Sequence, residues 1–179
     1  MIDWKMLSNA IEYYGNCGYR YVEVPWTVSR EIHRLTCEHD EWVIQSDIGA
    51  LVGSSEQSFL ELDRDGRLFP GRWLACTPCF RPDTVDDLHQ KGFMKVELYV
   101  NLAPSIEKVK IMLDHAYAFF NAHAPGHTAV VPTGEGTWDI EIGGIEVGSY
   151  GYREAAGTRW VYGTGIAEPR FSTAVSKLR

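Results

Sequence analysis

Short strand candidates that follow one another across turns are the feature that most constrains how this chain folds. Downstream of a long helical segment, four runs with strand character lie at residues 128–131, 137–142, 145–150 and 159–162, and glycines separate them. Gaps this short leave no room for helical crossovers, so neighbouring strands must run antiparallel. We therefore predict an α+β domain with a mostly antiparallel β-sheet flanked by helices, and not a doubly wound parallel sheet.

The other expected elements are strands at residues 19–24, 72–79 and 94–102, and helices at residues 4–14, 105–122 and 169–179. Apolar side chains recur at helical spacing in the long helix at 105–122, and Asp3 is placed to cap the first helix. Pro25 closes the first strand. No repeat, low-complexity tract or linker interrupts the chain, so we expect a single domain spanning residues 1–179.

Composition excludes several classes of protein. Hydrophobic residues make up 45% of the chain and aromatic residues 12%, which is too apolar for a disordered segment. The 17 Lys and Arg against 24 Asp and Glu give a net charge of −7, which argues against non-specific binding to nucleic-acid backbone. No apolar run approaches the roughly 20 residues of a membrane span. No basic-then-apolar leader opens the chain, so we expect a cytoplasmic protein without a membrane partner.

Four cysteines, Cys17, Cys37, Cys76 and Cys79, are expected to be reduced thiols, because nothing in the sequence signals secretion. Cys76 and Cys79 form a C-x-x-C pair that a zinc ion can use. Their surroundings have the character of a strand, in which buried free cysteines are common. We therefore favour buried thiols over a zinc site.

The first candidate site is the polar loop between the strands at 72–79 and 94–102. Arg81 follows the first strand, and an arginine there can bind a phosphate or a carboxylate through two parallel hydrogen bonds. Phe93 on the returning strand can stack on a base. Lys95 and Glu97 share one face because strand side chains alternate. The alternative is a hairpin with a solvated charged loop.

The second candidate site consists of polar residues on two adjacent strands, Asp139, Glu141, Glu146 and Ser149. Carboxylates that converge in a sheet repel one another unless a cation neutralises them. Their hard oxygen atoms suit Mg²⁺ carried by a nucleotide. The alternative is a partly exposed sheet face with salt bridges to Arg153 or Arg159.

The third candidate site is the segment from Gly163 to Arg170. Gly163 and Gly165 allow a strand to approach other backbone closely, and an arginine at a helix start suits a phosphate. Glycine-rich turns of this kind are also common without a function. The chain has no G-x-G-x-x-G after its first strand and no G-x-x-x-x-G-K-[ST], so the common nucleotide-binding folds are unsupported.

Taken together and in this order, these segments resemble the catalytic core of class II aminoacyl-tRNA synthetases, with the seryl type most similar. The first helix with Tyr21-Val22-Glu23-Val24-Pro25 is similar to motif 1, which builds the dimer interface in that family. Phe80-Arg81-Pro82-Asp83 and Phe93-Met94-Lys95-Val96-Glu97 match the two strands of motif 2. Gly163, Gly165 and Arg170 match motif 3.

Two further segments resemble elements of the family. Ser54-Ser55-Glu56 resembles the Thr-x-Glu loop that receives the amino group of the substrate. Glu146-Val147-Gly148-Ser149, preceded by Asp139-Ile140-Glu141, resembles the Glu-x-x-Ser element that holds Mg²⁺ and the ATP phosphates. The resemblance covers nearly the whole chain.

The resemblance implies ATP- and Mg²⁺-dependent activation of an amino acid as its adenylate. Arg81 and Arg170 would be the catalytic residues, with Arg81 on the α-phosphate and the substrate carboxylate. Arg170 would hold the γ-phosphate or stack on the base, with Phe93 stacking on adenine. The implied ATP-binding residues are Arg81, Asp83, Phe93, Glu146, Ser149 and Arg170; the implied metal ligands are Glu146 and Ser149; and the implied substrate-binding residues are Ser54, Glu56, Glu97, Asp139 and Glu141.

The chain departs from the family pattern at several points. Asp83 replaces a glutamate, Ser54 replaces a threonine, and no segment is left for an anticodon-binding domain or a tRNA-binding arm. The acceptor is therefore open between a carrier protein, a small molecule and a tRNA offered by another subunit, and glycine, alanine, serine and threonine all remain candidate substrates. The motif 1 match implies a homodimer. The alternative function is a non-catalytic synthetase paralogue that acts as a regulatory or assembly subunit. Both motif arginines are present, which favours the enzyme.

Overall fold

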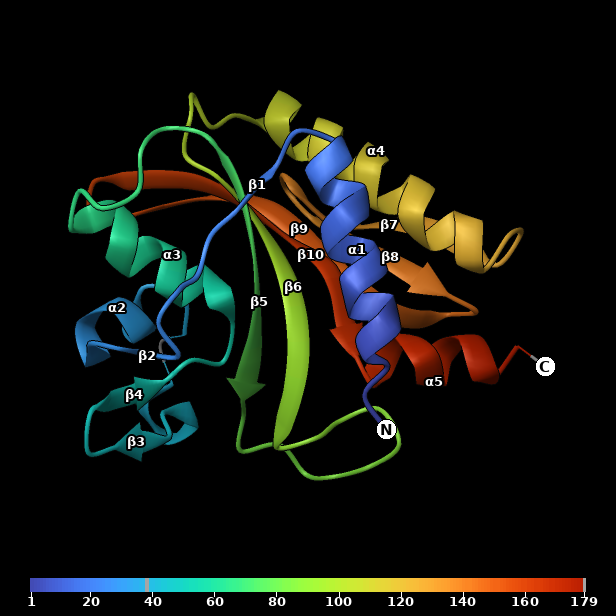
Figure 1. Cartoon of the computed structure of the whole chain (residues 1–179), viewed down its shortest axis with the longest axis horizontal. Helices are drawn as coiled ribbons and strands as arrows, with labels where there is room; N and C mark the ends of the chain where they lie inside the picture. Colours follow the sequence, from blue (N-terminus) through green and yellow to red (C-terminus); the bar gives the residue numbers. More distant parts are fainter. Residues whose placement is uncertain (38, 179) are drawn as a thin grey trace.

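A seven-stranded sheet organises the computed structural model, which describes residues 1–37 and 39–178 (Figure 1). Its strand order is β1-β5-β6-β10-β9-β8-β7. The strands are β1 (Arg20–Tyr21), β5 (Arg72–Phe80), β6 (Gly92–Val100), β7 (Thr128–Gly134), β8 (Thr137–Ile142), β9 (Ile145–Ala155) and β10 (Thr158–Glu168). The β1–β5 pairing is parallel, and the other five pairings of this sheet are antiparallel. The predicted α+β class with a mostly antiparallel sheet is confirmed.

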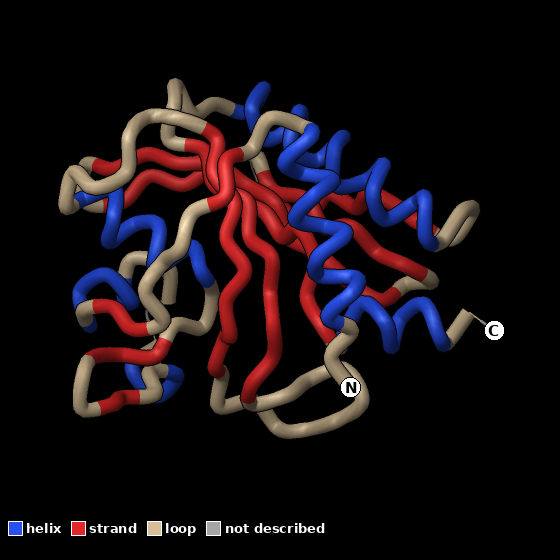
Figure 2. The backbone as a smooth tube through the Cα atoms, viewed as in Figure 1, coloured by secondary structure: helices blue, strands red, loops and turns tan. Residues whose placement is uncertain are grey.

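Helices cover both faces of the sheet (Figure 2). One face carries α1 (Trp4–Asn16), α4 (Ile106–His123) and α5 (Arg170–Ser176). The other face carries α2 (Arg30–Arg34), α3 (Ser55–Arg64), the 3₁₀ turn Asp40–Trp42, and a small second sheet of β2 (Thr27–Val28), β3 (Gln45–Ser46) and β4 (Gly49–Leu51). Within the described residues, no helix combines the length and apolar character needed to cross a bilayer.

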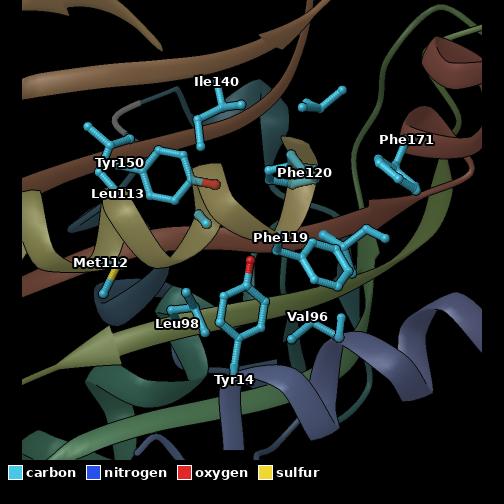
Figure 3. Packing of buried hydrophobic residues seen from close by; sticks show 14 of the residues in the cluster. Tyr14, Val96, Leu98, Met112, Leu113, Phe119, Phe120, Ile140, Tyr150 and Phe171 are labelled. Atoms are coloured by element: carbon cyan, nitrogen blue, oxygen red, sulfur yellow. The ribbon is translucent and has the colours of Figure 1, made fainter. Parts of the chain in front are cut away.

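The larger core lies between the sheet and the helices α1, α4 and α5 (Figure 3). Its aromatic side chains also hold the backbone of β10 in place. The buried Tyr14 hydroxyl of α1 donates to the Gly165 carbonyl at 2.9 Å, and the buried Tyr150 hydroxyl of β9 donates to the Thr164 carbonyl at 2.5 Å. These bonds occur where the β6–β10 register shifts, between Thr164 and Ile166. Two core tyrosines thus fix a bulge in the strand that leads to Arg170.

A second core lies under α3. The Phe59 ring stacks on Tyr99 of β6, with centroids 5.0 Å apart and planes inclined by 15°. Asp63 of α3 accepts hydrogen bonds from the Tyr99 hydroxyl and the Asn101 amide. The helix begins at Ser54, whose hydroxyl accepts from the Glu56 N–H. Burial and capping therefore fix α3 against the sheet.

Several boundaries differ from the sequence prediction. The strand expected at 19–24 pairs only at Arg20 and Tyr21; after one more bond, from the Val22 N–H to the Leu74 carbonyl, the chain leaves for the small sheet. The strand expected at 145–150 extends to Ala155, because residues 150–155 pair with β10. The strand expected at 159–162 extends to Glu168, because its second half pairs with β6. The helix at 105–122 is confirmed as α4. The elements from β2 to α3, both included, were not predicted.

Candidate active site

Two adjoining pockets open where β5, β6, β9 and β10 meet, and they share the residues Arg81, Lys95, Glu146 and Thr164. The loop-side pocket is also lined by Asp83, Leu88, His89, Gln90, Phe93 and Arg170. The α3-side pocket is also lined by Ser54, Glu56, Glu97, Ser149, Arg153 and Tyr162, among others. Arg81 therefore lies where the two pockets join.

The β5–β6 register explains why motif 2 residues gather here. Phe93, Lys95 and Glu97 alternate along β6 and so share one face of the sheet. Thr164 of β10 pairs with Glu97 on the other side of β6. The β5–β6 and β9–β10 hairpins thus contribute adjacent strands to the part of the sheet that lines both pockets.

Arg81 is fixed in position at the end of β5. Its Nε donates to the Gly53 carbonyl at 3.1 Å, and its guanidinium carbon lies 5.3 Å from the centroid of the Phe93 ring. Its backbone N–H donates to the Lys91 carbonyl across the loop. These contacts hold the side chain at the junction and leave it facing both pockets.

Arg170, the first residue of α5, links three segments. Its Nη1 lies 3.3 Å from the Glu146 carboxylate of β9, and its Nε donates to the Leu88 carbonyl at 3.4 Å. About half of the Glu146 side chain is exposed, so this ion pair is weak and open to exchange with a ligand. The pair lies at the mouth of the loop-side pocket.

The loop between β5 and β6 is ordered around Asp86. One Asp86 carboxylate oxygen accepts from the backbone N–H groups of Leu88 and His89 at 2.7 Å, and His89 Nδ1 lies 2.9 Å from the other oxygen. The His89 hydrogen bond, followed by the two backbone bonds, lowers the pKa of Asp86 to about 2. The Asp86 carboxylate therefore shapes the turn that presents Leu88 and His89 to the pocket.

The floor of the α3-side pocket holds a buried chain of hydrogen bonds. Lys95 Nζ lies 2.8 Å from one Glu97 oxygen, and the Ser54 hydroxyl donates to the other at 2.5 Å. Glu97 is almost completely buried. Each carboxylate oxygen thus has a partner within the protein.

Glu56 and Arg153 form a second ion pair in this pocket. Arg153 Nη1 donates to both Glu56 oxygens, at 3.0 and 2.8 Å, and the Trp160 indole N–H donates to one of them at 2.6 Å. Burial raises the pKa of Glu56, and the charge of Arg153 opposes that rise. The Arg153 guanidinium also lies over the Tyr162 ring, 4.3 Å from its centroid.

This pairing corrects one expectation and reveals a residue that was not assigned to the site. Salt bridges from Arg153 or Arg159 to the cluster of Asp139, Glu141 and Glu146 were considered as an alternative. Arg153 instead pairs with Glu56, and Arg159 pairs with the exposed Glu154. Arg153 lies four residues after Ser149 on the same strand, so alternation alone could have placed both on one face.

Comparison with known proteins identifies the fold. No protein-family model and no curated protein sequence matches the chain. Among solved structures, PylSc, a pyrrolysyl tRNA synthetase from Desulfitobacterium hafniense, superposes with a TM-score of 0.78 at 17% identity, covering 97% of this chain and 68% of that one. The chain has the class II aminoacyl-tRNA synthetase catalytic fold.

Seryl enzymes share this synthetase fold. The seryl-tRNA synthetase of Pyrococcus horikoshii, solved with ATP, superposes with a TM-score of 0.71 at 18% identity, covering 92% of this chain and 48% of that one. The cytoplasmic serine-tRNA ligase of Naegleria fowleri, solved with AMP, gives 0.71 at 16% identity, covering 95% and 47%. The chain thus spans about half the length of these two enzymes.

The synthetase fold brings most of the predicted site residues together. Asp83, Phe93 and Arg170 line the loop-side pocket, Ser54, Glu56, Glu97 and Ser149 line the α3-side pocket, and Arg81 and Glu146 line both. Asp139 and Glu141 of β8 line neither pocket. Burial raises the pKa of Asp139, and a hydrogen bond from Ser149 opposes that rise. Asp139 thus contacts the site through Ser149.

The candidate metal ligands carry oxygen atoms of the kind that Mg²⁺ prefers. Glu146 offers a carboxylate and Ser149 a hydroxyl, and Mg²⁺ is commonly held by one or two carboxylates together with substrate phosphates and water. Among the described residues, no group of three His, Cys, Asp or Glu side chains forms a closed metal cage. A protein-only site for a structural metal is therefore not present in this part of the chain.

Cys76 and Cys79 lie three residues apart on β5, so their side chains point to opposite faces of the sheet. Both are free thiols, and burial raises the pKa of each to about 11. Zinc binding needs thiolates that converge on one point. This geometry is that of two separate packed thiols.

Proposed function

We propose that this protein activates a carboxylate substrate, of the amino-acid class, with ATP and Mg²⁺ to form an acyl-adenylate. The observation that carries the proposal is the position of Arg81, which lines both pockets where they join. Adenylation requires the α-phosphate of a nucleotide and the carboxylate of a second ligand to meet at one point. A guanidinium there neutralises both anions at once.

The loop-side pocket is the proposed ATP site. Phe93 offers an aromatic face for adenine, and Arg170 offers a second cation at the mouth of the pocket. The weak contact between Arg170 and Glu146 would be replaced by contacts to the nucleotide. Asp83 lines the same pocket and is proposed to bind the nucleotide. The fold shared with synthetases solved with ATP or AMP supports nucleotide binding here.

The α3-side pocket is the proposed site for the carboxylate substrate. Its polar floor is formed by Ser54, Glu97 and Lys95, and its side by Glu56. The hydrogen bonds among these groups keep them rigid, and rigid positioning is the main source of rate in this class of reaction. Asp139 and Glu141 stay predicted substrate residues; neither lines this pocket, and Asp139 reaches it only through its hydrogen bond with Ser149.

Glu146 and Ser149 are the residues that would hold Mg²⁺. When bound, the metal supplies charge neutralisation at the ATP phosphates. The protein's part is to align the reacting carboxylate with the α-phosphorus, opposite the bond to pyrophosphate. Arg81 then stabilises the charge that accumulates on the phosphorus oxygens during in-line attack. No side chain of the site is required as a covalent nucleophile.

The acceptor of the activated acid, the cytoplasmic compartment and the homodimer remain predictions. Synthetase folds make a tRNA the first acceptor to test, and a carrier protein the second. A sedimentation measurement over a concentration series will determine the oligomeric state.

The test is ATP–pyrophosphate exchange with Mg²⁺ across the twenty amino acids and a set of simple carboxylic acids. We expect exchange with one or a few of them, and loss of exchange in Arg81→Ala. Arg67→Ala is the matched control, because Arg67 is exposed and lines neither pocket. Folded protein that neither exchanges pyrophosphate nor binds ATP by calorimetry would exclude adenylation and support the non-catalytic subunit.

A further inference from the structure

Two ion pairs of the α3-side pocket present their cations to a ligand and keep their anions behind them. The Arg153 side chain is 36% exposed, while that of its partner Glu56 is 6% exposed. The Lys95 side chain is 11% exposed, while that of its partner Glu97 is 1% exposed. In both pairs the positive end is the one that solvent, and hence a ligand, reaches.

Neither Glu56 nor Glu97 has a carboxylate oxygen without a partner, whereas Glu146, which this pocket shares with the loop-side pocket, is half-exposed and is the proposed ligand of Mg²⁺. Glu56 accepts from Arg153 and Trp160, and Glu97 accepts from Lys95 and Ser54. Because each of these oxygens is already bound by a buried donor, a ligand ammonium would compete with those donors for the charge and would not find a free carboxylate. A cationic side chain on the substrate would in addition meet Arg153 directly.

Arg153, by contrast, has donors to spare. A guanidinium carries five N–H donors in a fixed fork, and the hydrogen bonds found in the described part of the chain use only Nη1. The Tyr162 ring beneath it and the Glu56 carboxylate behind it hold its plane in position. A guanidinium held in this way is suited to a planar carboxylate or to a phosphate.

We propose that the substrate carries a second anionic group besides the reacting carboxyl, and that Arg153 binds this group. The inference rests on the proposed function for the identity of the pocket. Arg81 takes the reacting carboxyl at the junction, and Arg153 takes the distant anion at the α3 side. Dicarboxylic acids, acidic amino acids and phosphorylated hydroxy amino acids are the classes that satisfy this arrangement.

The test measures binding by calorimetry for matched acidic and neutral compounds, in the presence of Mg²⁺ and a non-hydrolysable ATP analogue. The pairs are aspartate with asparagine, glutamate with glutamine, succinate with succinamate, and O-phosphoserine with serine. We expect at least one acidic member to bind at least tenfold more tightly than its neutral partner. The first three pairs report a carboxylate, and the fourth reports a phosphate.

The variant is a double substitution, Arg153→Gln with Glu56→Gln, because removing Arg153 alone would leave a buried carboxylate unpaired. We expect the double variant to lose the tenfold preference. Arg159→Gln is the matched control, since Arg159 lies on the neighbouring strand and pairs with the exposed Glu154. It should keep the preference.

Each result decides the proposal. Four results overturn the role of Arg153. The neutral members bind more tightly, both members of every pair bind equally, no acid binds, or the preference survives in the folded double variant. Pyrophosphate exchange is measured in parallel on the same protein. A protein that exchanges with neutral amino acids only retains the proposed function and refutes this inference. A protein that binds an acid through Arg153 but never exchanges pyrophosphate supports this inference and refutes the proposed function.

Discussion

Arg81 and Phe93 face each other at the loop end of the β5–β6 hairpin, with the guanidinium carbon 5.3 Å from the ring centroid. The loop between them carries Leu88, His89 and Gln90 to the rim of the same pocket. One cation and one aromatic face are therefore held together before any ligand arrives. A nucleotide offers a partner to each of them, its base to the aromatic face and a phosphate to the cation.

Replacing Phe93 with leucine tests the aromatic face. Leucine keeps the pocket apolar but removes the π-surface, and stacking of a base on an aromatic ring contributes about 1–3 kcal/mol. We expect the affinity for ATP to fall about tenfold, measured by calorimetry with Mg²⁺. Phe69→Leu is the control, because Phe69 is exposed and lines neither pocket. Unchanged affinity in Phe93→Leu would place the base elsewhere.

Glu56→Ala tests the buried pair with Arg153. The substitution leaves Arg153 and the Trp160 N–H without their acceptor. We expect a loss of about 2–3 kcal/mol in the free energy of unfolding, less than the ~3–5 kcal/mol of a fully buried pair, because part of Arg153 reaches solvent. Urea denaturation measures the loss. Glu154→Gln, which breaks an exposed pair, should cost less than about 0.5 kcal/mol; equal losses would contradict this account.

Gly163→Ala tests the close packing of β10. An added Cβ would overlap the Tyr150 ring and lie 2.5 Å from the Met112 sulfur. Overpacking of this kind costs about 1–3 kcal/mol, and we expect a corresponding fall in melting temperature. Gly15→Ala in α1 is the matched control, since nothing lies within 4 Å of its added Cβ. That substitution should be neutral or stabilise the protein by up to about 1 kcal/mol.

The pH dependence of the β5–β6 loop follows from Asp86. Its folded-state pKa of about 2 lies below its ordinary value of 3.8. The stabilisation is therefore complete above pH ~4 and is lost as the pH falls from there through 2. A ¹³C NMR titration of the Asp86 carboxyl should show a midpoint near 2, and Asp86→Ala assigns the signal. A midpoint near 4 would show that the His89 contact does not persist in solution.

The spacing of apolar residues and glycines along the sequence was sufficient to predict the long helix and the antiparallel strands. The apolar spacing at 105–122 predicted α4, and the short glycine-flanked runs predicted the antiparallel strands. The helix α3 was missed, although Ser54 and Gln57 carry a cap signature: Gln57 Oε1 accepts from the Gly53 N–H, and Ser54 caps the helix start. Its sequence lacks a clean apolar stripe, because both of its faces contact protein.

The partners of the site residues could not be predicted from spacing. Glu56 was expected to receive a ligand, but Arg153 and Trp160, about one hundred residues later, already bind it. Nothing near Glu56 in the sequence signals either partner, since the contact depends on how β9 and β10 lie under α3. Motif resemblance located the pockets; the pairing of charges inside them required the tertiary structure.

The pairing of β6 with β10 has a consequence for how the candidate active site forms during folding. Glu97 and Thr164 are paired across these two strands, yet residues 101–157 lie between the strands in the sequence. Each hairpin can form locally, but neither contains both halves of a pocket. Closing so long a loop is slow compared with hairpin formation. During refolding, the ability to bind a ligand should therefore appear after most secondary structure has formed, and any change that delays the docking of α4 would delay it further.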